Sequence, residues 1–101
     1  MIINISIDKL YTIDKIKRQL NAKILCVSGN VIWCDGFYIK LINGLLEINV
    51  YSSELTEKDI LYDIIKPVLN EKQRTFIRIQ KGRMVSQFVF NKNEKIDCVL
   101  I

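Results

Sequence analysis

Three cysteines are the residues of this sequence best suited to covalent chemistry: Cys26, Cys34 and Cys98. A thiol becomes an efficient nucleophile when a neighbouring base or positive group favours the thiolate, and histidine is the usual base. The 101 residues contain no histidine, which removes every Ser–His or Cys–His pair and most zinc sites. The thiols lack Cys-x-x-Cys spacing, and their odd number argues against a disulfide framework. We therefore expect reduced, buried cysteines and no catalytic residue.

Two carboxylates one helical turn apart, Asp59 and Asp63, form the other candidate for chemistry, with Glu57 nearby. Such a pair resembles a metal ligand set or an acid–base pair. Without histidine or a second acidic cluster, a solvated helix face is the expected role. The four glycines occur singly and form no phosphate-binding loop. We expect no metal, no cofactor and no enzymatic activity.

Positive charge is concentrated between residues 72 and 83, where no acidic residue occurs. The basic side chains are Lys72, Arg74, Arg78, Lys81 and Arg83. Strand alternation would place Arg74, Phe76, Arg78 and Gln80 on one face, and such a basic and aromatic strip can hold phosphates and stack a base. There are two alternatives: the charges protect an exposed sheet edge from aggregation, or they contact an acidic protein partner.

Trp33 and Tyr38 are the aromatic residues whose position favours an interface. Aromatic side chains supply much of the binding energy when they fill a pocket of a partner. Core packing is the more common role of such a residue. For Trp33 the sequence therefore leaves a core position and an interface position open.

Short apolar segments at the start of the chain predict a strand, a helix and a hairpin. Ile2 to Ile7 is typical of a strand, and one helical arc follows, formed by Leu10, Ile13, Ile16 and Leu20. Lys23 to Ser28 and Val31 to Cys34 are nearly continuous apolar strands joined by Gly29–Asn30. Because both faces of this pair are apolar, we expect central strands covered on both sides, either by helices or by a partner chain. The register places Cys26 opposite Trp33 and Cys34 opposite Leu25, with the two thiols on opposite faces.

Asn43–Gly44 is the clearest turn signal, because the residues around it agree on one register. It sets Ile42 opposite Leu45, Lys40 opposite Glu47 and Phe37 opposite Val50, with one face wholly apolar. We expect an ion pair between Lys40 and Glu47. Asp35–Gly36 is either a third tight turn, giving a four-stranded meander, or a bulge in one long strand.

The second half predicts a capped helix followed by three strands. Thr56 is the expected N-cap, and Pro67 should kink or break the helix after Lys66. The apolar stripe consists of Ile60, Leu61, Ile64, Ile65, Val68 and Leu69. The strands are Thr75 to Gln80, Met84 to Phe90 and Ile96 to Ile101. The element order β-α-βββ(β)-α-βββ indicates an α+β fold in which two helices pack on a largely antiparallel sheet.

Length and charge set the broad class. We expect one globular domain over residues 1–101, because about a hundred residues can bury a sufficient core. The longest apolar runs are far shorter than the ~20 residues that cross a bilayer, so we expect a cytoplasmic protein without a membrane partner. The net charge of +4 permits acidic partners. The abundance of isoleucine, lysine and asparagine is typical of an AT-rich genome.

The order of elements resembles the roadblock/longin-like family of small interaction modules. There a helix precedes three antiparallel strands, as Leu55 to Leu69 precedes the last three strands here. The earlier helix and the hairpin Lys23 to Cys34 are similar to that family's first helix and hairpin. The resemblance implies a non-catalytic homodimer or heterodimer that scaffolds or regulates a small GTPase.

The sequence therefore predicts a non-enzymatic protein-interaction module, such as an adaptor, a regulator or an inhibitor, and a homodimer. Trp33 and Tyr38 would contact the protein partner. The alternatives are a nucleic-acid-binding protein that uses Arg74, Phe76, Arg78, Lys81 and Arg83, or an inhibitor of a host defence system encoded by a virus or mobile element.

Overall fold

The computed structural model describes residues 1–7, 11–69, 75–90 and 97–100, and these residues form one eight-stranded sheet with the order β2-β3-β4-β5-β1-β6-β7-β8. Every neighbouring pair of strands is antiparallel. The strands are β1 (Ile2–Ser6), β2 (Ile24–Ser28), β3 (Val31–Cys34), β4 (Phe37–Ile42), β5 (Leu45–Val50), β6 (Thr75–Lys81), β7 (Met84–Phe90) and β8 (Asp97–Leu100). The helical segments are α1 (Ile13–Gln19), the π-helix η1 (Asp59–Ile65) and the 3₁₀ helix η2 (Lys66–Val68). The α+β class and the antiparallel sheet are as predicted.

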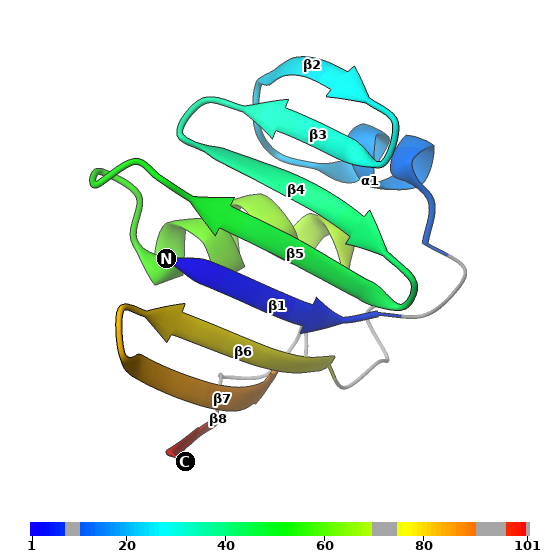
Figure 1. Ribbon diagram of the computed structural model, residues 1–101. Coiled ribbons are helices and arrows are strands. Elements are labelled where there is room, and N and C mark those ends of the chain that lie inside the picture. The colour runs from blue at the N-terminus through cyan, green and yellow to red at the C-terminus, as the bar shows by residue number, and fades with distance from the viewer. Residues whose placement is uncertain (8–10, 70–74, 91–96, 101) are drawn as a thin grey trace.

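The N-terminal strand β1 lies in the interior of the sheet, between β5 and β6. Since β1 is antiparallel to both neighbours, β5 and β6 are parallel to each other, and η1 and η2 form the crossover between them. The helix α1 forms a second crossover, from β1 to β2. These crossovers start on antiparallel strands and run in opposite directions along the sheet, so right-handed connections place both on one face. Figure 1 shows α1 and the second helical segment together behind the sheet.

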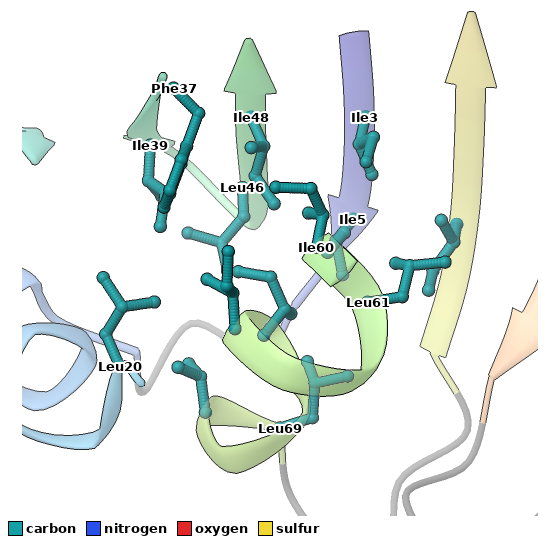
Figure 2. Close-up of a cluster of buried hydrophobic side chains, with 14 of the residues drawn as sticks. Ile3, Ile5, Leu20, Phe37, Ile39, Leu46, Ile48, Ile60, Leu61 and Leu69 are labelled. Carbon is teal, nitrogen blue, oxygen red and sulfur yellow. The ribbon is translucent and has the colours of Figure 1, made fainter. Parts of the chain in front are cut away.

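The hydrophobic core lies between the helices and this face of the sheet (Figure 2). Alternation along β1 directs Ile3 and Ile5 into the core, where both are fully buried. Their partners across the ladder are also buried: Ile48, Leu46, Ile79 and Ile77. No helix of the described residues covers the other face of the sheet, which is called the open face below.

The hairpin across Asn43–Gly44 has the predicted register, with Phe37 opposite Val50 and Ile42 opposite Leu45. Lys40 and Glu47 are also opposite each other, but no ion pair joins these two described side chains, so that prediction is wrong. Exposed ion pairs gain little free energy in water, and register alone does not enforce them. Asp35–Gly36 is a tight turn between β3 and β4, which confirms the meander and rejects the bulge.

The prediction that the pair β2–β3 is central in the sheet is wrong. β2 is an edge strand, and four of its five residues are exposed: Leu25, Cys26, Val27 and Ser28. A bulge at Leu25 shifts the register, so Cys34 lies opposite Ile24, whereas Cys26 lies opposite Trp33 as predicted. An apolar strand resembles a central one in sequence, because position in the sheet depends on pairings that the strand does not encode.

Threonine caps begin both α1 and the second helix, which consists of the α-helical residues Glu57 and Lys58 followed by η1 and η2. The Thr12 side chain accepts a hydrogen bond from the Lys15 amide and caps α1, whose Ile16 is fully buried. Of the arc predicted for this helix, Leu10 lies outside the described residues. Thr56 caps the second helix as predicted, and Pro67 falls where η1 gives way to η2 at Lys66, as expected for a residue without an amide hydrogen.

Candidate functional site

The open face carries both surfaces that the sequence suggested for binding, the aromatic pair Trp33 and Tyr38 and the strip that contains Phe76. Trp33 and Tyr38 project from β3 and β4, since their neighbours Ile32 and Ile39 are buried on the helical side. Phe76 projects from β6 for the same reason. Four strand spacings separate β3 from β6 in rank, about 19 Å by the usual interstrand distance. The two surfaces are therefore neighbours on one face but separate sites.

Trp33 is 38% exposed, so it does not occupy a core position. Its ring packs against Tyr38 with centroids 4.9 Å apart and planes tilted by 48°. The Tyr38 hydroxyl in turn accepts a hydrogen bond of 3.3 Å from the Asn49 side chain. These contacts fix both rings before any partner binds, so little side-chain freedom is lost on docking.

The bulge in β2 adds an apolar side chain to this aromatic pair. It sets both Leu25 and Cys26 against Trp33, and Leu25 is 58% exposed. We call Leu25, Cys26, Trp33 and Tyr38 the β2-end cluster. The exposure of Leu25 was not foreseen, because a glycine-free apolar strand gives no sign of a bulge.

The basic strip of residues 72–83 is divided by the structure. Lys72 and Arg74 lie outside the described residues. Phe76 and Arg78 face the open side, whereas Lys81 forms an ion pair with Glu57 and Arg83 lies in the turn between β6 and β7. The strip does not guard a sheet edge, because β6 lies between β1 and β7 in the interior of the sheet.

Arg78 belongs to a row of five polar residues across the open face, where it lies between Asn4 and Gln87. The paired residues, in spatial order, are Lys40, Glu47, Asn4, Arg78 and Gln87. Beside this row the surface is hollowed by about 400 Å³. We call this the β6 hollow, and its lining includes Asn4, Ser6, Phe76, Arg78 and Gln87.

Asn4 and Gln87 are members of the hollow that the sequence interpretation missed. For Gln87 a signal existed, since a two-residue turn at Gly82–Arg83 pairs Lys81 with Met84 and hence Arg78 with Gln87. For Asn4 no local signal exists, because β1 and β6 are joined only through long-range pairing.

The cysteines differ sharply in their surroundings. Cys34 is fully buried, and desolvation raises the pKa of its thiol to about 11, which makes it a poor nucleophile at neutral pH. Cys26 is exposed, so the prediction of three buried cysteines is wrong for this residue. The side chain of Cys98 lies outside the described part of the chain. Cys26 and Cys34 are both free and lie on opposite faces, as predicted.

Asp59 is used to cap the second helix. Its carboxylate accepts hydrogen bonds from the Thr56 amide at 2.8 Å and the Thr56 hydroxyl at 2.9 Å, and its own amide donates to that hydroxyl. The backbone bond, and then the side-chain bond, lower the pKa of Asp59. Within the described residues, no group of three or more cysteine or acidic side chains is arranged to hold a metal ion.

No family model, curated protein or solved structure matches this chain. No helix in the described residues is long and apolar enough to span a membrane. The class of protein that the fold defines is a two-layer α+β protein with one open sheet face.

Proposed function

We propose that this chain is a non-enzymatic protein-interaction module that forms a homodimer through the β2-end cluster. The observation that carries the proposal is the exposure of Leu25 on the edge strand β2, which has no charged residue, and of Trp33 on the neighbouring strand β3. Aromatic anchors in the centre of an apolar patch are typical of protein interfaces.

The bulge in β2 favours binding through side chains over binding through the strand backbone at the β2-end cluster. Regular strand addition needs an unbroken ladder, and the bulge interrupts β2 at Leu25. Side-chain docking therefore carries the interaction, with Leu25 and Trp33 as its anchors. Bulges commonly protect edge strands from aggregation, and this one leaves the apolar side chains available.

Charge favours a second copy as the occupant of this surface. The chain carries a net charge of +4, so two copies repel each other through most of their basic surface. β2 has no charged residue between Ile24 and Ser28, which makes this edge suited to contact between identical chains. The roadblock/longin-like resemblance supports a dimer as well. The dimer could act as an adaptor, a regulator or an inhibitor of a host defence system. Identification of the macromolecule that the dimer binds would distinguish these three roles.

Trp33 is the sole tryptophan and therefore reports on its own interface. We expect its fluorescence emission to shift to shorter wavelength as protein concentration rises through the micromolar range, because dimer formation removes water from the indole. Leu25→Asp should keep the long-wavelength emission at all concentrations. Met84→Asp is the matched control, since Met84 is 77% exposed on β7, away from the cluster. Emission that is independent of concentration in the unmodified protein would contradict the proposal.

A further inference from the structure

The β6 hollow contains an aromatic ring whose exposure packing does not explain. Phe76 is 67% exposed, although it belongs to an interior strand whose next residue, Ile77, is buried. On an open sheet face, an exposed phenyl ring offers a flat apolar surface on which a planar group can stack. Stacking on aromatic side chains is a common mode of binding unpaired bases.

Arg78 supplies positive charge two residues further along the same strand and the same face. Its partners across the ladder are the neutral side chains of Asn4 and Gln87, and no hydrogen bond or ion pair with a described residue holds its guanidinium. The nearest carboxylate in the row is Glu47, on the far side of Asn4 and opposite Lys40. Among the described residues, no acidic side chain lines the hollow, which favours an anionic occupant.

Asn4 contributes an amide with an unmet hydrogen bond. Its side-chain oxygen is shielded from solvent and accepts no hydrogen bond from the described residues. Such an acceptor is costly to leave without a donor. Arg78, its partner on β6, and Gln87, one strand further along the row, have long, exposed side chains, which can reorient and admit a donor from a ligand. The amide of Gln87 offers a second donor and acceptor on the same row.

We infer that the β6 hollow binds one nucleotide of single-stranded nucleic acid. The base stacks on Phe76, the amides of Asn4 and Gln87 bond to its edge, and Arg78 binds the adjacent phosphate. An acidic peptide would use Arg78 alone and would leave the ring and both amides without a role. The hollow uses β1, β6 and β7 and not β2, so this inference does not depend on the proposed dimer.

The test is fluorescence anisotropy with a labelled oligouridine and a labelled oligothymidine, titrated with the full chain at several salt concentrations. Phe76→Ala should raise the Kd about tenfold or more at every salt concentration, since stacking on an aromatic side chain is worth that much per base. Arg78→Gln should lower the salt slope by about 0.7, the expected effect of one lost phosphate contact on a single strand. Arg83→Gln removes an equal charge outside the hollow, and Met84→Ala removes an exposed apolar side chain outside it.

The outcomes separate the inference from its rivals. A Phe76→Ala protein that binds as tightly as the unmodified chain overturns the inference, as does equal loss of salt slope in Arg78→Gln and Arg83→Gln. Competition by a polyglutamate peptide equal to that by unlabelled oligonucleotide would assign the hollow to an acidic protein. Displacement by uridine monophosphate at the same nucleotide concentration would assign it to a free nucleotide. Leu25→Asp should leave oligonucleotide affinity unchanged, so failure of the dimer and failure of this site are distinguishable.

Discussion

Gly36 is the position where a single added methyl group should damage the fold most specifically. Its φ of +87° lies in the left-handed region, and a Cβ atom there would lie 2.7 Å from the Ser52 Cβ and 3.1 Å from the Leu55 Cδ1. The backbone fixes this approach, because the Gly36 carbonyl accepts hydrogen bonds from the Tyr51 and Ser52 amides at 3.0 and 3.1 Å. The Ser52 Cβ therefore cannot move aside without disturbing the turn.

Gly29 is the matched control, since its φ is +58° and nothing lies within 4 Å of its added Cβ. Both alanine variants incur the left-handed cost of about 1–2 kcal/mol. Gly36→Ala adds an overpacking cost of about 1–3 kcal/mol, which is a large fraction of the stability of a typical domain.

Urea unfolding followed by circular dichroism measures the difference between the two variants. We expect Gly36→Ala to lose at least about 1 kcal/mol more of the free energy of unfolding than Gly29→Ala. Adding Ser52→Gly should recover much of that excess in a double-mutant cycle. Equal destabilisation by Gly36→Ala and Gly29→Ala would refute the close approach between the β3–β4 turn and residue 52.

The remaining predictions concern titratable groups. Asp59 has a lowered pKa in the folded chain, so its hydrogen bonds stabilise the fold above the ordinary aspartate value of 3.8, and this contribution is lost as the pH falls through the folded pKa. Asp59→Asn should therefore lower the free energy of unfolding at pH 7. In urea titrations below about pH 4, the variant should lose less of this free energy with falling pH than the unmodified protein does. An equal loss in both proteins would contradict the Thr56–Asp59 cap. In a Cys98→Ser background, Ellman's reagent should react promptly with the exposed Cys26. Cys34 should react only after unfolding, because its thiol is buried and has a pKa of about 11. Two prompt thiols in the native protein would contradict the burial of Cys34.

Local patterns predicted much of the fold. Asn43–Gly44 set the register of β4 and β5 because both flanking strands alternate between apolar and polar residues, and only one pairing satisfies both. Thr56 was identifiable as a cap because its hydroxyl can satisfy a free amide and because Leu55 and Ile60 flank it with the spacing of a hydrophobic staple. Such features depend on residues close in sequence.

Features that depend on distant pairings were predicted poorly. The interior position of β1 and the edge position of β2 follow from the crossovers, and an apolar strand such as Ile24–Ser28 is compatible with either position. The same reason explains the site: Asn4 meets Arg78 only through β1–β6 pairing, although Phe76 and Arg78 share a face by simple alternation. The π-helical form of η1 also has no signal in the stripe that predicts a helix.

The contribution of Leu25 to the free energy of dimerisation can be worked out from its exposure. Leu25 is 58% exposed, and complete burial of a leucine side chain is worth about 1.5–3 kcal/mol, so its burial at an interface contributes about 0.9–1.7 kcal/mol per chain. Two copies in a symmetric dimer contribute about 1.7–3.5 kcal/mol, which corresponds to a change of about 20- to 350-fold in Kd.

Sedimentation velocity across the micromolar range tests this central claim most directly. We predict a species of twice the 11.8 kDa chain mass for the unmodified protein, a Kd about 20- to 350-fold weaker for Leu25→Ala, and no change for Met84→Ala. A species of 11.8 kDa at every concentration, or equal dissociation of the Leu25→Ala and Met84→Ala variants, would contradict the assignment of the β2-end cluster as the dimer interface.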